Sequence, residues 1–269
     1  ILIFFIPHHH IGGAERVHLN IIKAFQYKPI VFFDYSNSNT ISKDFTENAY
    51  CFLITNAKRR KYAFRFLQVL TFVFPVTLFG CKLNSFLTKY SVGEDMAKLK
   101  DDYNNLVKTL TNHWTITGMY VQMLWMLSIG IMLDTDEQNI RILSSMIDNE
   151  NVNDALYDFL IKYRLTDWER CSDTVLFPVP YQSTLSIISS NNQSKELSIQ
   201  KLEKYLKKEW YRGHSDCAWH DDHKYGIRHD GYWSFESGAL VKVLGLDDTS
   251  LKGLPYYPYD MVHWNENKI

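Results

Sequence analysis

One stretch constrains the fold more than any other, because residues 116–133, ITGMYVQMLWMLSIGIML, are apolar on nearly every side. A helix without a polar face must be covered by other elements on all sides. Asp134 and Asp136 follow directly and mark its end. The sequence therefore predicts a central, buried helix over 116–133, around which the remaining elements are arranged.

The rest of the chain after residue 90 also shows helical periodicity and few strand signals. We expect further helices at 91–112, 137–148, 152–164, 181–190, 195–211 and 231–244. Ser91 and Glu94 have the spacing of a capping box at a helix start, and Gly245 fits the residue that follows a helix end. The predicted fold over 82–269 is mainly α, an array of helix pairs.

The first 81 residues have a different pattern. Residues 1–6 and 29–34 are apolar runs typical of buried strands, and residues 14–26 between them have helical periodicity. A strand, a helix and a strand in this order open a parallel α/β domain. We therefore predict a short α/β, Rossmann-like fragment at 1–81 before the helical domain.

The segment 66–81 is almost wholly apolar, contains Pro75 and follows five basic residues at 58–65. Its 16 residues are fewer than the roughly 20 that a spanning helix needs, and Pro75 would break or kink a helix. The pattern favours a core or interface element over a membrane-surface segment, with a true span as the third interpretation. We therefore do not expect a membrane partner.

Charge is divided unevenly along the chain. Residues 1–90 carry 11 Lys and Arg against 4 Asp and Glu, a net of +7, whereas residues 91–269 carry 18 against 26, a net of −8. An acidic domain does not suit nucleic acid, whose phosphates require basic side chains. It suits a basic protein partner such as a nuclease.

The cysteines and the missing catalytic motifs indicate a cytoplasmic binding protein. Cys51, Cys81, Cys171 and Cys217 are far apart and form no CxxC pair, so we expect reduced thiols. The chain has no GxSxG motif, no P-loop and no complete nucleotide-binding fingerprint. We expect no catalytic residues, no cofactor and no enzyme activity, and the oligomeric state stays open.

A dense polar cluster follows residue 213, and it allows two interpretations. Its members are His214, Asp216, Cys217, His220, Asp221, Asp222, His223, His229, Asp230 and Glu236. Two histidines at i and i+3, with a cysteine three residues earlier, are compatible with a metal site. The cluster has none of the established metal-binding spacings, so a hydrogen-bonded acidic loop is the favoured interpretation and no metal is expected.

Acidic residues crowd into the last part of the chain and are the candidates for partner contact. These candidates are Asp221, Asp222, Asp230, Glu236, Asp247, Asp248 and Asp260. A solvated face is the alternative interpretation of the same residues. For Trp219, Tyr232, Trp233, Phe235, Tyr257 and Pro258 we expect structural roles as packing anchors and turn residues.

The first 35 residues resemble the N-terminus of a GT-B glycosyltransferase. The resemblance rests on the strand ILIFFIP, the loop GGAER at 12–16 and the helix LNIIKAF, and it extends weakly through 60–80. In that family the glycine-rich loop lies near the interdomain cleft, where helix N-terminal amides can meet an acceptor or a phosphate. The second half that carries the donor-sugar site does not follow, so a fragment or an accessory protein of polysaccharide synthesis is the implied alternative.

Residues 82–269 resemble the PoNi immunity proteins. The motifs are YSVGED at 90–95, MYVQMLWMLSIGIML at 119–133, GYWSFESGAL at 231–240, GLDD at 245–248 and YYPYDMVH at 256–263. The resemblance implies a helical antagonist of a secreted nuclease (DNase) toxin. Before residue 82 the sequence departs from the family pattern, because the glycosyltransferase-like piece stands where an initial helical segment is expected. A fusion that leaves the protein inert is a third possibility.

Overall fold

The computed structural model describes residues 3–6, 30–34, 50–54, 78–110, 114–217, 219–225 and 231–265. The chain divides into two compact units, Ile1–Pro75 and Val76–Ile269. Each unit is treated by itself.

The described part of the first unit is a small parallel sheet. Its strands are β1 (Ile3–Ile6), β2 (Ile30–Asp34) and β3 (Tyr50–Ile54), in the order β1-β2-β3. In the register, Ile3 pairs with Ile30 and Ile30 pairs with Tyr50. β1 and β2 coincide with two predicted strands, and β3 was not predicted. The predicted helix at 14–26, the GGAER loop and most of the apolar segment 66–81 lie outside the described residues.

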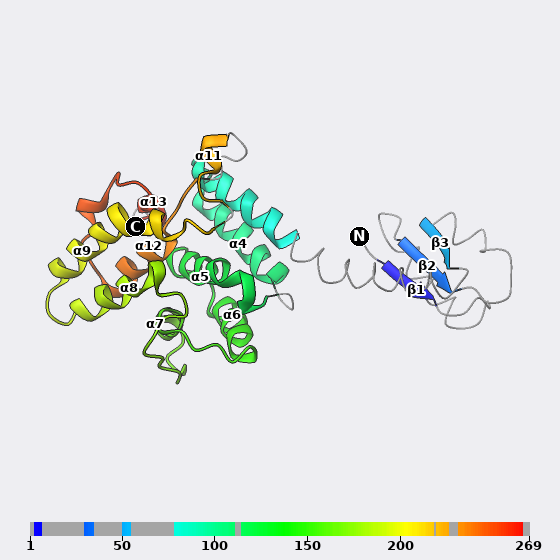
Figure 1. Ribbon diagram of the computed structural model, residues 1–269, viewed down its shortest axis with the longest axis horizontal. Coiled ribbons are helices and arrows are strands. Elements are labelled where there is room, and N and C mark those ends of the chain that lie inside the picture. The colour runs from blue at the N-terminus through cyan, green and yellow to red at the C-terminus, as the bar shows by residue number, and fades with distance from the viewer. Residues whose placement is uncertain are drawn as a thin grey trace. The chain divides into compact units, whose positions relative to one another are not determined.

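The second unit is mainly helical, which confirms the mainly α part of the predicted fold class (Figure 1). A helix at 78–91 precedes the labelled ones. The following elements are α4 (Met96–Leu110), α5 (Ile116–Met132), α6 (Glu137–Asn149), α7 (Ala155–Arg164), α8 (Pro178–Ser190), α9 (Lys195–Lys204), the π-helical turn η1 (Tyr205–Trp210), α10 (Tyr211–Gly213), α11 (Asp222–Tyr225), α12 (Phe235–Leu244), η2 (Thr249–Leu251) and α13 (Tyr259–Val262).

Helix α5 is the central helix that its composition predicts, except that the backbone at Thr117, Gly118 and Met119 is not helical, so the regular helix begins after Met119. It packs against α4, α6, α7 and α12, and every residue from Met123 to Met132 is buried (Figure 1). Gly130 allows the close approach of α4, because a Cβ at this position would lie 2.4 Å from the Tyr103 hydroxyl oxygen. That hydroxyl donates a hydrogen bond to the Met126 carbonyl at 2.8 Å.

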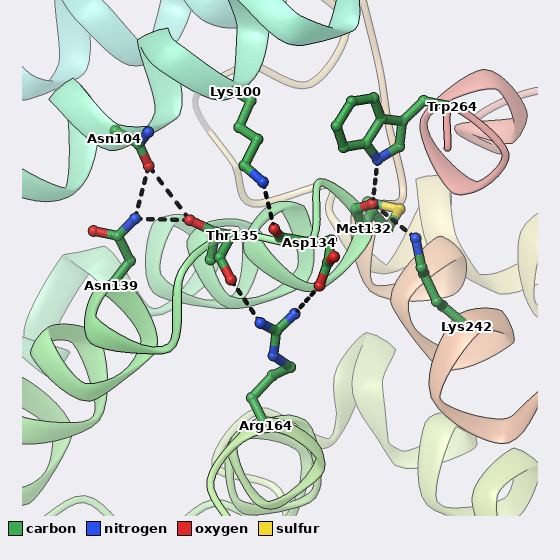
Figure 2. Close-up of polar contacts among 9 residues, drawn as sticks. All are labelled: Lys100, Asn104, Met132, Asp134, Thr135, Asn139, Arg164, Lys242 and Trp264. Atoms are coloured by element: carbon green, nitrogen blue, oxygen red, sulfur yellow. Dashed lines mark hydrogen bonds and ion pairs between the residues drawn. The ribbon is translucent and has the colours of Figure 1, made fainter. Parts of the chain in front are cut away.

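The C-terminal end of α5 is held by donors from distant parts of the chain (Figure 2). The Met132 carbonyl accepts from Lys242 Nζ at 3.0 Å and from Trp264 Nε1 at 2.8 Å. The last carbonyls of a helix have no partner within the helix, and a cation near them also complements the helix dipole. The contacts therefore bind α12 and the C-terminal segment to the central helix.

The turn after α5 is anchored in the same way. Arg164 donates to the Asp134 carboxylate and to the Thr135 carbonyl, both at 2.6 Å, and Lys100 donates to the Asp134 carbonyl at 2.6 Å (Figure 2). Asp134 has a φ of +48°, so this turn adopts a left-handed backbone at a non-glycine residue. Cations from α4 and α7 stabilise that turn.

The predicted capping box at Ser91 is wrong. Ser91 ends the helix at 78–91, where its hydroxyl donates to the Leu87 carbonyl at 2.8 Å. Gly93, with a φ of +82°, makes the turn. The cap of α4 is Asp95, whose carboxylate accepts from the amides of Ala97 and Lys98 at 3.0 and 3.2 Å.

Other helix boundaries differ less from the prediction. α12 begins at Phe235 rather than at 231, and the helix predicted at 195–211 contains the π-helical turn η1. The predicted end at Gly245 is confirmed, because this residue has a φ of +59° and its amide caps the Val241 carbonyl.

Candidate functional site

A carboxylate lies in the interior at the start of α12, and it belongs to a predicted contact residue. Glu236 is fully buried, and its Oε1 accepts hydrogen bonds from the Tyr205 hydroxyl at 2.9 Å and from the Ser234 hydroxyl at 2.7 Å. Burial raises the pKa of the Glu236 carboxyl above its usual value. Because no part of this side chain reaches solvent, we remove Glu236 from the candidate contacts.

Asp248 is the second interior carboxylate among the candidates. Only 3% of it is exposed, and it accepts hydrogen bonds from the Tyr257 hydroxyl and, at 2.8 Å, from His263 Nε2. These partners lie in the C-terminal stretch, so Asp248 holds that stretch to the end of α12. Its burial removes it from the contact set as well.

The remaining described candidates are at least partly exposed and lie on different elements. Asp221 accepts from the Tyr211 hydroxyl at 2.7 Å and pairs with Lys224 at 2.8 Å, and the Lys224 ammonium lowers the pKa of the Asp221 carboxyl. Asp222 begins α11, Asp247 follows α12, and Asp260 lies on α13. Asp230 lies outside the described residues.

One candidate, Asp247, lines an acidic groove together with two further carboxylates, those of Glu196 and Glu203. The hollow has a volume of about 800 Å³, and Lys195 on its wall donates to the Gly245 carbonyl at 2.8 Å. Hydrogen bonds from Ser194 to Glu196 and from Thr249 to Asp247 lower the pKa of both carboxyls, which keeps them ionised at neutral pH.

Sequence reasoning missed the two glutamates of this groove. They are seven residues apart on the α9 helix, and this spacing, two helical turns, places them on one face. The sequence therefore contained the signal for the two glutamates. It contained no signal that the stretch after α12, with Asp247, packs beside the same face of α9.

The aromatic residues with predicted structural roles lie in or against the core. Trp219 lies 5.8 Å from Trp210 and 5.6 Å from Tyr232 between ring centroids. Trp233 donates its indole N–H to the Ser91 hydroxyl at 2.9 Å, which connects residues 142 positions apart. Phe235, Tyr257 and Pro258 are buried.

The histidine-rich cluster is a set of separate local contacts. His214 is buried, with Nδ1 2.6 Å from the Trp210 carbonyl and Nε2 2.7 Å from the Tyr181 hydroxyl. Burial lowers the pKa of His214 to about 4. Within the described ranges no three His, Cys, Asp or Glu side chains are grouped as metal ligands, and His229 and Asp230 lie outside those ranges.

Comparison with family models places the chain in the class of immunity proteins. A model for the N-terminal part of the PoNe immunity proteins matches residues 58–145, and one for the C-terminal part matches residues 152–261. The chain therefore belongs to the PoNi family, as the sequence motifs predicted. The match begins at residue 58, which is 24 residues before the predicted domain boundary at 82.

A solved structure has a similar fold. The crystal structure of protein PA2201 from Pseudomonas aeruginosa matches with a TM-score of 0.53 and 18% sequence identity, over 71% of this chain and 75% of that chain. At this identity the likeness concerns the fold alone. Comparison with curated proteins gave no match. Among the described helices, none has the length and apolar character required to cross a bilayer.

Proposed function

We propose that this protein neutralises its cognate PoNe nuclease toxin by stoichiometric binding, without catalysis or a cofactor. The observation that carries the proposal is the match to both parts of the PoNi family over 58–145 and 152–261. The net charge of −8 over residues 91–269 supports it, because a nuclease needs a basic surface to hold DNA phosphates. Such a binder would act in the cytoplasm, where the toxin meets DNA.

We further propose that the acidic groove contacts the basic surface of the toxin. Glu196, Glu203 and Asp247 place three carboxylates around one hollow, in which Lys195 is the one basic lining residue. Glu203 also pairs with Lys207, which lies outside the lining. Charges at the rim of an interface mainly accelerate association and select the partner. Asp221, Asp222 and Asp260 are proposed as separate contacts outside the groove.

Co-expression tests the function and the groove together. Cells that carry the toxin gene should grow when the full chain is present, and the two proteins should co-purify. A Glu203→Lys/Asp247→Lys variant should slow association several-fold at low salt. A matched control reverses two exposed acids elsewhere, Glu150→Lys/Glu169→Lys, with the same change in net charge. Equal effects of both variants would contradict the groove proposal.

A glycosyltransferase origin is the second proposal, now limited to residues 1–57 because the PoNi match begins at residue 58, and the three parallel strands favour it. In that case residues 1–57 would descend from a protein of polysaccharide synthesis and would not contribute to immunity. A chain that begins at residue 58 should then protect as well as the full chain. Loss of protection on this truncation would show that residues 1–57 take part in immunity.

A further inference from the structure

A pocket lined by aromatic rings lies apart from the acidic groove. It has a volume of about 310 Å³ and is formed by the start of α5, by Phe177 with the first turn of α8, and by the end of α10 with the residues after it. This volume is at the lower end of the range of about 300–1,000 Å³ typical of ligand pockets. The pocket is therefore sized for a small group such as a single side chain.

Successive rings form a connected wall of this pocket. The centroids of Phe177 and Tyr120 are 4.7 Å apart, and those of Tyr120 and Tyr181 are 5.4 Å apart. The wall continues from Tyr181 to His214 at 5.4 Å and from His214 to Trp219 at 5.2 Å.

The polar atoms of this wall already have partners inside the protein. The Tyr120 hydroxyl donates to Asp154 Oδ2 at 3.0 Å, and the Tyr181 hydroxyl lies 2.7 Å from His214 Nε2. These two hydroxyls are thus engaged in the interior. Tyr120, Tyr181 and His214 are at most 3% exposed, so the ring surface open to a ligand comes from Phe177 and Trp219.

Exposed apolar side chains gather beside the pocket. Leu176, Phe177 and Val179 are 44%, 47% and 75% exposed, and they are half of the large exposed apolar residues in the described part of the chain. Scattered exposed apolar residues are ordinary, whereas a concentration of them beside a cavity is typical of an interaction site. Phe177 and Val179 also line the pocket itself.

The charge of the lining selects the kind of group that would enter. Asp216 is the one carboxylate among the lining residues, and no Lys or Arg is among them. His214 is neutral at pH 7, because burial lowers its pKa to about 4. Ring faces attract cations through their quadrupole, and a nearby carboxylate adds to this attraction.

We propose that this pocket receives one arginine or lysine side chain of the toxin. The aliphatic stem would pack against Val179, and the cationic head would lie over the rings of Phe177 and Trp219 with Asp216 as its counter-charge. The inference rests on the proposed immunity function and identifies a contact beyond the acidic groove. It makes the aromatic pocket an energetic anchor of the interface, whereas the groove acts on the association rate.

The test measures the affinity of the full chain for the purified toxin, made inactive by mutation of its nuclease site. Phe177→Ala should weaken binding about tenfold and Asp216→Asn about fivefold. Phe177→Leu should weaken it nearly as much as Phe177→Ala, because leucine keeps apolar contact but has no π face. The controls are Val92→Ala, at an exposed apolar residue outside the pocket, and Glu169→Gln, at an exposed acid. All variants should keep the melting temperature of the parent.

Three other outcomes are distinguishable. If the parent chain does not bind the toxin, the proposed function fails and this inference fails with it. If the parent binds and Phe177→Ala and Asp216→Asn bind equally well, the pocket is not part of the interface. If only Phe177→Ala weakens binding, and Phe177→Leu and Asp216→Asn do not, the pocket receives an apolar side chain and the cation proposal is overturned.

Discussion

The carboxylates of the last third of the helical unit fall into two regions, the interior beside α12 and the surface around it. Glu236 and Asp248 are buried and accept hydrogen bonds from Tyr205, Ser234, Tyr257 and His263, whereas Asp216, Asp247 and Asp260 are exposed. Asp247 and Asp248 are neighbours in sequence and still belong to different regions. The difference separates residues that hold the fold from residues that are available to a partner.

The largest loss of stability is expected when an interior carboxylate is replaced by alanine. Glu236→Ala leaves the buried hydroxyls of Tyr205 and Ser234 without their acceptor, so the free energy of unfolding should fall by about 4 kcal/mol. Glu236→Gln keeps an acceptor oxygen of the same geometry, so it should stay close to the parent. Urea denaturation of the three proteins checks this. If both substitutions lower the free energy of unfolding equally and only slightly, the hydrogen bonds of Glu236 do not stabilise the fold.

The second largest loss of stability is expected from substitution of Asp154, another buried carboxylate. Its carboxylate caps α7 by accepting from the amides of Leu156 and Tyr157, each at 3.0 Å, and it also accepts from Tyr120 and, at 2.8 Å, from the Leu176 amide. Asp154→Ala should lower the free energy of unfolding by about 3 kcal/mol, and Asp154→Asn by less. A loss below about 1 kcal/mol for alanine would show that water replaces the carboxylate.

Acid should destabilise the helical unit through His214. Its folded pKa of about 4 is below the usual 6.5, so between these values the unfolded chain binds more protons. Stability from this residue is therefore complete above about pH 6.5 and falls as the pH drops towards 4, by about 2 kcal/mol between pH 7 and pH 5. The raised pKa of Glu236 and of Asp154 acts in the opposite direction.

The contribution of His214 is isolated by comparing the parent with His214→Gln at each pH. The difference between their free energies of unfolding should shrink as the pH falls from 7 to 5. A constant difference over this range would contradict the assignment of a neutral, buried imidazole.

The smallest effect on stability is expected at the surface. Asp260→Asn should change the free energy of unfolding by less than about 0.5 kcal/mol, because the side chain is exposed. If Asp260 is a contact, its substitution should lower the association rate with the toxin and weaken the salt dependence of that rate. Thermal unfolding and stopped-flow mixing measure the two quantities separately. A large loss of stability would move Asp260 into the interior group.

The sequence predicts the central helix well, because the apolar character of 116–133 has one physical solution, burial on all sides. It also predicts the end of α12, since Gly245 meets a local backbone requirement. The prediction from residue spacing was wrong at Ser91. Ser91 and Glu94 have the spacing of a capping box, but Ser91 lies at the end of the helix at 78–91. The actual cap is Asp95, which lies four residues after the predicted cap Ser91.

The candidate site was predicted less completely, because exposure is a tertiary property. Glu236 appears in the sequence as one more acid in an acidic stretch, and its burial depends on Tyr205, 31 residues away. The acidic groove and the aromatic pocket depend in the same way on segments brought together by folding. For the aromatic pocket the lining residues span 118 to 219.

The most direct test of the account is titration of the full chain into the purified, inactivated toxin by calorimetry, followed by a DNA-cleavage assay with active toxin. We expect a saturable complex of fixed stoichiometry whose affinity falls with salt, and cleavage that stops once the chain is in equimolar amount. Absence of a complex, with cleavage unaffected at a large excess of the chain, would contradict an immunity function for this protein.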